Sequence, residues 1–343
     1  CSVRRQRQMC IRDRNVSWVK GLKIMWESFW FEFINFYFIP GLVLGCIYAL
    51  GAIGITLTFG ILRFANFAHG EIMMTSSYLT WEFVLVASSF GLILHPIIGA
   101  IPASICAIIL ALIVDRLFYK PFRNSPTIMI VIASFGMMLI IRSMVQVIWG
   151  PNQITFVKGI AKPNPIIKDF TSSIDIMLLI PNKHIFILLG TIIIMLIFNY
   201  LLSSTKIGKG MRAVSDNPNL AEVSGINVEN IVKATWVVGG FCAAAAGVFL
   251  AMDTQFIEST MGFRMLLPMF AAAILGGIGR PFGAVAGGLI IGLAEELSAY
   301  PWLGDGPVIS PGYKSGVAFS IMVVMLIFRP VSYTHLTLPT NGT

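Results

Sequence analysis

Long apolar runs separated by short polar stretches recur along almost the whole chain. A hydrocarbon layer about 30 Å thick is crossed by roughly 20 helical residues, and only helices and closed barrels satisfy their backbone hydrogen bonds inside lipid. The pattern therefore predicts an all-α, polytopic transmembrane helix bundle of about eight membrane segments, some of them broken. The predicted spans are residues 33–60, 72–89, 91–114, 127–149, 184–203, 231–251, the interrupted pair 264–278 and 282–299, and 314–328.

The composition excludes an ordinary soluble domain. Hydrophobic residues make up 56% of the 343 residues, charged residues only 12%, and the mean hydropathy is +0.82, whereas soluble domains carry roughly 25% charged residues. The net charge is +8, but five arginines against one aspartate within residues 1–14 supply half of it. The rest of the chain is only mildly basic, so we expect no nucleic-acid partner.

Both ends of the chain differ from its apolar body. Residues 1–14 (CSVRRQRQMCIRDR) contain neither an apolar run nor a cleavage site of small residues, which is unlike a signal peptide. The last residues, VSYTHLTLPTNGT, are polar and follow the final apolar run abruptly. We therefore expect residues 1–24 to be a non-native or disordered leader and residues 331–343 to be a non-native tail, both similar to translated adapter sequence, and residues 25–330 to form one transmembrane domain.

Motifs for catalysis, metal binding and phosphate binding are absent from the sequence. The five cysteines form no metal-ligand pattern, and the four histidines form no His-Glu-x-x-His motif. Gly208-Lys209 is followed by Gly210 and lacks the earlier glycine of a phosphate-binding loop. We therefore expect no catalytic residue, no metal site, no cofactor and no ATP hydrolysis by this chain.

The basic residues predict the orientation of the bundle, because short cytoplasmic loops carry an excess of Lys and Arg. Two basic clusters follow the third and the fifth predicted span: Arg116, Lys120 and Arg123, and Lys206, Lys209 and Arg212. We expect both loops in the cytoplasm. Residues 150–183 then form the largest external loop.

A polar break separates the first two spans at residues 60–71, GILRFANFAHGE. It places Asn66, His69 and Glu71 between apolar runs without a conventional loop. Polar, irregular backbone at membrane depth must line a cavity or be buried in protein, because lipid cannot satisfy it. The alternative is a tight cytoplasmic turn with a solvated Glu71 and a helix-capping Asn66.

A second break lies near the end of the chain. Gly276, Gly277 and Gly279 precede a proline, and Gly283 and Gly287 follow it within a run of small-xxx-small spacing. This spacing lets two helix backbones approach closely, so packing alone is a sufficient interpretation. Breaks in the front and the back of an apolar chain are also typical of transporters built from repeated halves, although the two halves share no clear identity.

Two adjacent carboxylates, Glu295 and Glu296, stand near the external end of the last broken segment. Carboxylates inside membrane segments are costly unless they are paired or hydrated. One interpretation is a solvated pair that reaches the membrane surface. The other is a role in a translocation pathway or a docking site.

The segment between the fifth and the sixth span carries helix signals of its own. Asn217 is a capping residue with Pro218 at the first helical position, and Gly225 stands where a left-handed residue ends a helix. These signals predict a helix of about two turns. We expect it to be a docking surface; an ordinary interfacial helix is the alternative.

The chain resembles the LivH-type permease subunit of bacterial branched-chain amino acid ABC importers over residues 33–330. The most specific stretch is GLVLGCIYALGAIGITLTFGILRFANFAHGEIMM, in which residues 66–71 match the family signature N-F-A-H-G-[ED]. The second is AAAILGGIGRPFGAVAGGLIIGLAE, which ends at Glu295. The complete first signature favours the H-type subunit, while Glu296 and the two ends depart from the family pattern.

The resemblance implies a multi-pass permease of the bacterial inner (plasma) membrane that imports leucine, isoleucine and valine. The implied partners are a LivM-like second permease subunit, two ATP-binding cassette ATPase subunits, a periplasmic substrate-binding protein and membrane lipid. The capped segment corresponds to the family's ATPase-coupling segment, with Lys209, Arg212, Asp216, Asn217, Pro218 and Gly225. We expect the translocation pathway or gate to include Asn66, His69, Glu71 and Glu295.

Three alternatives stay open at this point. A permease of the same class could import urea or short amides. A secondary transporter or channel without an ATPase is a different class, against which the capped cytoplasmic helix argues. A membrane-embedded enzyme is a third class, against which the missing catalytic cluster argues.

Overall fold

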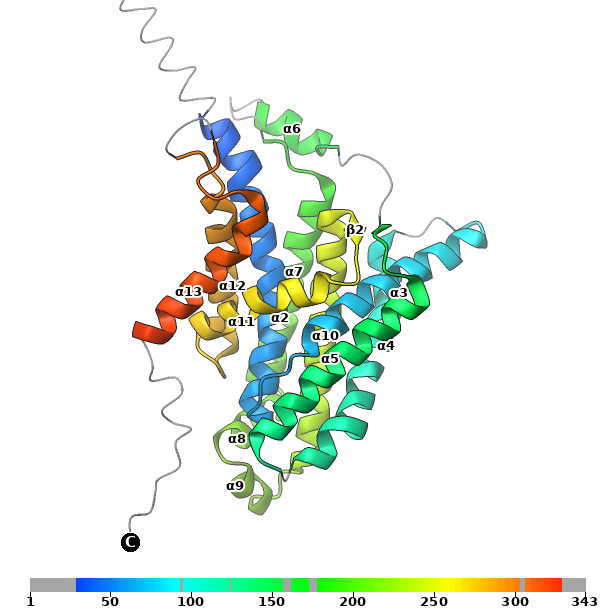
Figure 1. Ribbon diagram of the computed structural model, residues 1–343, viewed down its shortest axis with the longest axis vertical. Coiled ribbons are helices and arrows are strands. Elements are labelled where there is room, and N and C mark those ends of the chain that lie inside the picture. Colours follow the sequence, from blue (N-terminus) through cyan, green and yellow to red (C-terminus); the bar gives the residue numbers. More distant parts are fainter. Residues whose placement is uncertain are drawn as a thin grey trace, which may run out of the picture.

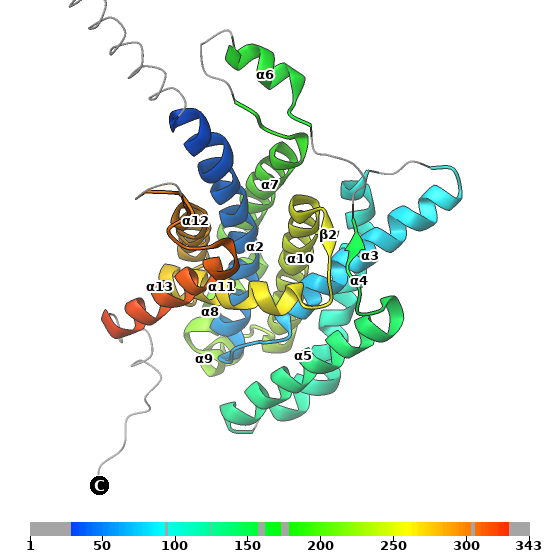
Figure 2. The ribbon, with the colours of Figure 1, turned by 45° about the horizontal axis from the view of Figure 1, so that its top comes forward.

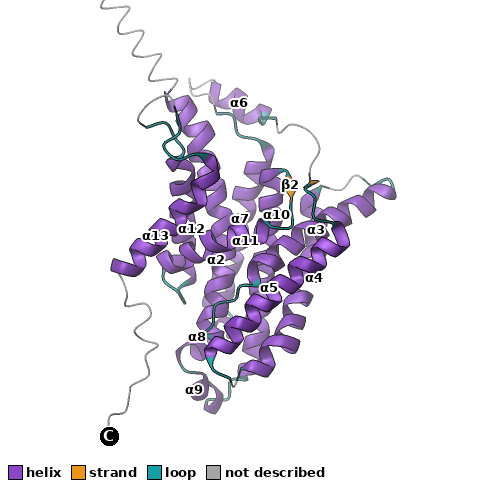
Figure 3. Ribbon diagram, in the orientation of Figure 1, coloured by secondary structure: helices purple, strands orange, loops and turns teal. Residues whose placement is uncertain are grey.

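The computed structural model describes residues 29–92, 95–123, 125–156, 162–172, 178–302 and 306–328. These residues form a bundle of helices with one pair of very short strands (Figure 1, Figure 3). The predicted terminal segments 1–24 and 331–343 lie outside the described residues. The elements are η1 (Phe33–Phe38), α2 (Ile39–Leu62), α3 (His69–Ser89), α4 (Pro96–Val114), η2 (Asp115–Tyr119), η3 (Lys120–Phe122), α5 (Thr127–Trp149), β1 (Ile154–Thr155), α6 (Pro165–Ser172), α7 (Asn182–Ser204), α8 (Lys206–Asp216), α9 (Pro218–Val223), α10 (Val228–Thr254), β2 (Phe256–Ile257), α11 (Met261–Gly276), α12 (Pro281–Ser298), η4 (Pro311–Tyr313) and α13 (Lys314–Phe328).

Six helical stretches of the described residues are long and apolar enough to cross a membrane: Phe29–Leu62, Pro96–Phe122, Thr127–Trp149, Asn182–Ser204, Val228–Thr254 and Pro281–Ser298. α3 has 21 residues but is more polar, and α11 and α13 are shorter apolar helices of 16 and 15 residues. Each predicted span falls on one of these helices. The predicted polytopic helical bundle is therefore confirmed, and the number of segments that cross the membrane stays a prediction.

α2 and α10 form the centre of the bundle. α2 packs against α7, α10, α11 and α12, and α10 also packs against α3 and α4. Figure 2 shows α3, α4 and α5 on one side of this centre and α12 and α13 on the other, while α11 crosses the centre and packs against α2, α3, α12 and α13. The central helices are largely buried, while α4, α5 and α7 keep exposed apolar faces.

Small residues let α2 and α12 meet backbone to backbone. A Cβ atom added to Gly292 would overlap the backbone of Gly45, and one added to Gly288 would overlap the backbone of Ala49. Gly45 and Ala49 are four positions apart on α2, and Gly288 and Gly292 are four positions apart on α12. Residues at this spacing lie on the same face of a helix, so the two contacts belong to one continuous interface. This is the close approach that small-xxx-small spacing allows in membranes.

The predicted break between α11 and α12 is present. Gly277 and Gly279 have φ angles of 90° and 85°, which favour glycine, and they end α11 and turn the chain into α12. Gly276 and Gly283 lie so close that a Cβ on either would overlap the backbone of the other, and Gly287 meets the backbone of α11. These five glycines lie at the helix ends and at the α11–α12 contact.

Three local features were not predicted from the sequence. Residues 206–216 form the separate helix α8, and residues 165–172 form the short helix α6. β1 pairs antiparallel with β2, with Ile154 opposite Ile257. Figure 1 shows α6 at one end of the bundle and α8 and α9 at the other.

Candidate functional site

The polar break at residues 60–71 turns back into the bundle. Arg63 takes a left-handed conformation with φ 59°, which ends α2, and α3 begins six residues later. Asn66 holds the turn, because its Oδ1 accepts the backbone N–H two residues ahead at 3.1 Å and the hydroxyl of Tyr119 at 2.9 Å. Asn66 is 1% exposed, so this turn lies inside the protein.

His69 lies beside the middle of α2. A Cβ atom on Gly54 would collide with the imidazole ring of His69, and Gly54 precedes the last residue of α2, Leu62, by eight residues. At 1.5 Å per residue this is about 12 Å along the helix. His69 is 2% exposed, and its Nε2 has no hydrogen-bond partner among the described residues. Asn66, His69 and Glu71 are therefore buried in protein, and the interpretation as a turn with a solvated Glu71 is wrong.

Glu71 forms a buried ion pair with Arg142 of α5. Arg142 Nη2 donates to Glu71 Oε1 at 2.5 Å; the Glu71 side chain is 0% exposed and that of Arg142 is 19% exposed. The guanidinium also lies over the ring of Phe263, 5.1 Å from its centroid. Within the described chain, Glu71 Oε2 and Arg142 Nε have no partner, so each group can make a further hydrogen bond.

Arg142 was missed by the sequence analysis. It stands inside the apolar span 127–149, and an arginine at membrane depth is rare and normally paired, which was the available signal. Three more hydrogen bonds join the same side of α5 to its neighbours: Ser134 Oγ accepts from Phe67 N at 3.1 Å, Gln146 Nε2 donates to Ser259 Oγ at 3.0 Å, and Trp149 Nε1 donates to Glu82 Oε2 at 3.1 Å. α5 is thus held by a row of polar contacts.

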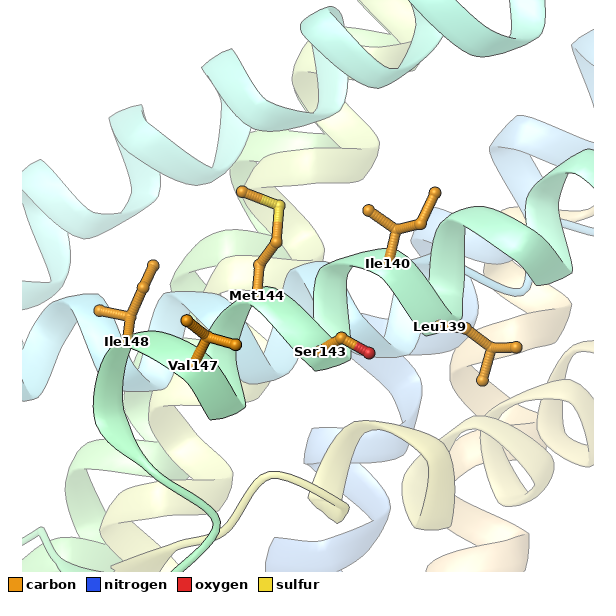
Figure 4. A pocket seen from close by; sticks show the side chains of 6 residues that line it. All are labelled: Leu139, Ile140, Ser143, Met144, Val147 and Ile148. Atoms are coloured by element: carbon orange, nitrogen blue, oxygen red, sulfur yellow. The ribbon is translucent and has the colours of Figure 1, made fainter.

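The outer side of α5 has a different character. A shallow groove of about 430 Å³ on this side is lined by six residues of α5, drawn in Figure 4: Leu139, Ile140, Ser143, Met144, Val147 and Ile148. No titratable side chain lines this groove, and a single hydroxyl is its polar group. It therefore offers no charged group that could recognise a polar solute.

Glu295 and Glu296 have separate partners. Glu295 is 3% exposed and accepts a hydrogen bond from the Tyr48 hydroxyl at 2.7 Å, within the α2–α12 interface. Glu296 pairs with Lys314 of α13 at 2.6 Å. The interpretation as a solvated pair is wrong for Glu295. None of the hydrogen bonds described for Glu295 reaches the break around Glu71, so the structure does not bring these two predicted site residues together.

The predicted short helix is present as α9. Asn217 Oδ1 accepts the N–H of Leu220 at 3.1 Å, Pro218 is the first helical residue, and Gly225 follows with φ 85°. Leu220 is 64% and Val223 87% exposed, so α9 presents apolar side chains outside the bundle. The other predicted coupling residues, Lys209, Arg212 and Asp216, are exposed on α8.

α8 is fastened directly to the end of α2. Ser215 Oγ donates to the carbonyl of Gly60 at 3.1 Å, and the guanidinium of Arg63 donates to the carbonyl of Ser215. Gly60 and Arg63 belong to the same stretch that leads into the buried break. A displacement of α8 would therefore act on the polypeptide that carries His69 and Glu71.

A charged cluster braces the same end of the bundle. Arg123 donates to both carboxylate oxygens of Asp115 at 2.7 Å and to Glu229 at 2.8 Å, and Lys120 reaches Glu229 at 2.9 Å. The cluster joins the segment after α4 to the start of α10. From the sequence, Arg123 and Lys120 predicted only the cytoplasmic side of the bundle, and their acidic partners were not predicted.

Comparison with known proteins gives a consistent picture. The profile of the family described as branched-chain amino acid transport system / permease component matches residues 37–326. The chain is 32% identical over 295 residues to the high-affinity branched-chain amino acid transport system permease protein BraD of Pseudomonas aeruginosa, covering 85% of this chain and 92% of BraD. It is 30% identical over 296 residues to the corresponding LivH of Escherichia coli K12, covering 84% and 92%. Among solved structures, PsaBC from Streptococcus pneumoniae in complex with Fab has a TM-score of 0.45 at 14% identity, covering 88% of this chain and 96% of that chain.

Proposed function

Because the chain belongs to the permease component family of branched-chain amino acid transport systems, we propose that it is the membrane-spanning subunit of an ATP-driven importer of leucine, isoleucine and valine. The observation that carries the proposal is the family match over residues 37–326, which runs from the first long helix into α13. The similar proteins BraD and LivH are named for the same transport system. The chain is a multi-pass protein of the inner membrane.

The proposed assembly contains further chains. A second, LivM-like permease subunit lies beside this one in the membrane, two ATPase subunits bind at the cytoplasmic side, and a periplasmic binding protein delivers the substrate. ATP hydrolysis takes place on the ATPase subunits, in keeping with the missing phosphate-binding loop of this chain.

The α8–α9 segment couples this chain to the ATPase. Its exposed apolar residues Leu220 and Val223 and the exposed charges of α8 offer a surface for a protein partner. ATP binding closes the ATPase subunits, and the movement is passed on as rigid-body rocking of membrane helices. The contacts of Ser215 with Gly60 and Arg63 supply a path from α8 to the buried break.

The translocation pathway passes the buried break. Asn66, His69 and Glu71 supply its polar groups, and Arg142 is added to them by its ion pair with Glu71. An amino acid is a zwitterion, with a carboxylate that an arginine binds and an ammonium group that a carboxylate binds. The buried Glu71–Arg142 pair therefore offers both complementary charges, whereas urea has neither charge.

Uptake by the reconstituted complex tests this function. With all subunits in proteoliposomes, we expect ATP-dependent uptake of leucine that isoleucine and valine inhibit and that urea and isobutyramide leave unchanged. Replacing Asp216, Asn217 and Pro218 together by alanine removes the start of α9 and should abolish uptake and substrate-stimulated ATP hydrolysis, while the complex still assembles. Asn152→Ala, an exposed asparagine at the opposite end, is the control. Uptake of urea in place of leucine would contradict the substrate, and normal stimulation in the triple variant would contradict the coupling.

A further inference from the structure

A second pocket lies at the end of the bundle that carries α8. It has a volume of about 400 Å³ and is formed where the ends of α2 and α7 meet α8 and the start of α12. Gly60, near the end of α2, and Gly279 of the α11–α12 turn both line it, and a Cβ atom added to Gly60 would lie 3.5 Å from the Cα of Gly279. Gly60 and Ile61, at the start of the stretch that leads into the break, line the pocket, whereas Asn66, His69 and Glu71 do not.

The interior of this pocket is mostly apolar. The apolar lining residues come from four elements and include Leu57, Ile61, Leu202, Met211 and Phe282. The pocket stays partly open on its outer side, where Ser203 and Phe282 are exposed. An apolar slot that is partly open at the end of membrane helices can admit a hydrocarbon chain.

The polar lining of the pocket is positively charged. Arg212 of α8 and Arg280 of the α11–α12 turn both line it, and it contains no Asp or Glu. Within the part of the chain that the structure describes, neither arginine is engaged in an ion pair. Two guanidinium groups over one apolar slot attract an anion that carries an apolar tail.

The start of α12 adds to the positive electrostatic potential of the pocket. Phe282 and Gly283, in the first turn of this 18-residue helix, line the pocket, and the capping residue Arg280 makes no side-chain cap hydrogen bond. The first backbone N–H groups of a helix are unpaired within it and favour a negative group. The phosphate of a lipid and the two arginines would meet at this point.

We propose that this pocket binds one anionic phospholipid of the cytoplasmic leaflet, with its phosphate between Arg212 and Arg280 and part of an acyl chain in the apolar slot. The basic residues of α8 and of the segment after α4 indicate that this end of the bundle faces the cytoplasm. The cytoplasmic leaflet carries anionic lipids, which attract basic residues near the membrane surface. Since α8 lines the pocket, the bound lipid would brace the segment that couples to the ATPase.

Native mass spectrometry of the full-length, delipidated chain tests the site. Phosphatidylglycerol and phosphatidylcholine with identical acyl chains are titrated in parallel, and one tightly retained phosphatidylglycerol is expected. Arg212→Gln/Arg280→Gln should weaken the binding of phosphatidylglycerol by about fivefold for each arginine and remove the preference over phosphatidylcholine. Arg212→Lys/Arg280→Lys keeps the charge and should keep the preference. Arg116→Gln removes an exposed arginine from the same end of the bundle, outside the pocket, and should change nothing.

The apolar slot is tested separately. Ser203→Trp fills the pocket from its open side and should reduce retention of both lipids, whereas Ser204→Trp, at an exposed neighbour that does not line the pocket, should not. Equal binding of the two lipids by the unmodified chain, or undiminished preference in Arg212→Gln/Arg280→Gln, would overturn the proposal. Displacement of phosphatidylglycerol by millimolar inorganic phosphate would also overturn it, because a free anion would then be the ligand. Lipid retention is read without transport, so failure here is distinct from failure of the proposed import function.

Discussion

The α2–α12 interface and the attachment of α5 hold helices together by different means. α12 lies on α2 through glycines whose backbones touch, as at Gly292 and Gly45. α5 is held to α3 and to the break before it by the ion pair between Glu71 and Arg142 and by hydrogen bonds. A glycine interface has a single close-packed arrangement, whereas polar groups can exchange partners. We therefore expect α2 and α12 to form a fixed frame and α5 to move against it during transport.

The largest effect on stability is expected at the ion pair. Arg142→Leu leaves Glu71 buried without its partner, which should lower the free energy of unfolding by about 3–5 kcal/mol. Glu71→Leu/Arg142→Leu removes both charges and should recover most of that loss, but leucine uptake should stay absent because no charge remains for the zwitterion. Thermal unfolding in detergent and uptake in proteoliposomes are measured on the same preparations. Restored uptake in the double variant would show that the pair only supports the fold.

A methyl group added at the α2–α12 interface is expected to have the next largest effect on stability. Gly292→Ala forces α12 away from the backbone of α2 and should lower the free energy of unfolding by about 2–3 kcal/mol. Gly136→Ala on α5 is the matched control, because nothing lies within 4 Å of its added Cβ. Unfolding temperatures of the two variants give the comparison. Equal unfolding temperatures would contradict the close-packed frame.

The neutral hydrogen bonds of Ser134 on α5 should contribute less to stability than the ion pair or the glycine contacts. Ser134→Ala leaves the N–H of Phe67 and the carbonyl of Ala65 without their partner, which should cost about 1–2 kcal/mol. Ser134→Thr keeps the hydroxyl and serves as the control. The two variants are compared by thermal unfolding and by uptake of leucine. If Ser134→Ala lowered the free energy of unfolding more than Arg142→Leu, the hydrogen bond of Ser134 would be the stronger attachment of α5, contrary to this account.

The outer side of α5 should contribute least to the stability of the isolated chain. Val147 is 85% exposed in the apolar groove of Figure 4. Val147→Ala should therefore change the free energy of unfolding of the isolated chain by less than about 0.5 kcal/mol. The measurement is again thermal unfolding in detergent, with the unmodified chain beside it. A loss comparable to that of Ser134→Ala would show that this face is packed within the chain itself.

The sequence was sufficient for the long helices and for α9, because long apolar runs and helix caps are local signals. The spans 127–149 and 314–328 coincide with α5 and α13, and the Asn217-Pro218 cap begins α9 where expected. The buried turn was also visible as a polar stretch between apolar runs. These features follow from hydrophobicity and backbone conformation within a few residues.

The contacts of the candidate site could not be predicted in the same way. Glu71 and Arg142 are 71 residues apart, and Tyr48 and Glu295 are 247 residues apart, so their pairing depends on how the helices pack. The rarity of arginine within an apolar span is a signal for Arg142 but not for its partner, and neither Arg142 nor the pair was predicted. Helix α8 was missed because glycines at 208 and 210 weaken its local helix signal, and these glycines fit against α7 and α10.

The movement of α5 against the α2–α12 frame is tested most directly by a reversible cross-link. Ser134 Oγ lies 3.1 Å from the backbone nitrogen of Phe67, so the two residues are neighbours across the contact between α5 and the break, and a cysteine is placed at each position. Phe67→Cys/Ser134→Cys is made in a chain whose five cysteines are replaced, with each single cysteine as a control. Once the cross-link has formed, ATP-dependent leucine uptake should stop, and reduction with dithiothreitol should restore it. Full uptake by the quantitatively cross-linked complex would contradict a movement of α5 away from the break that follows α2.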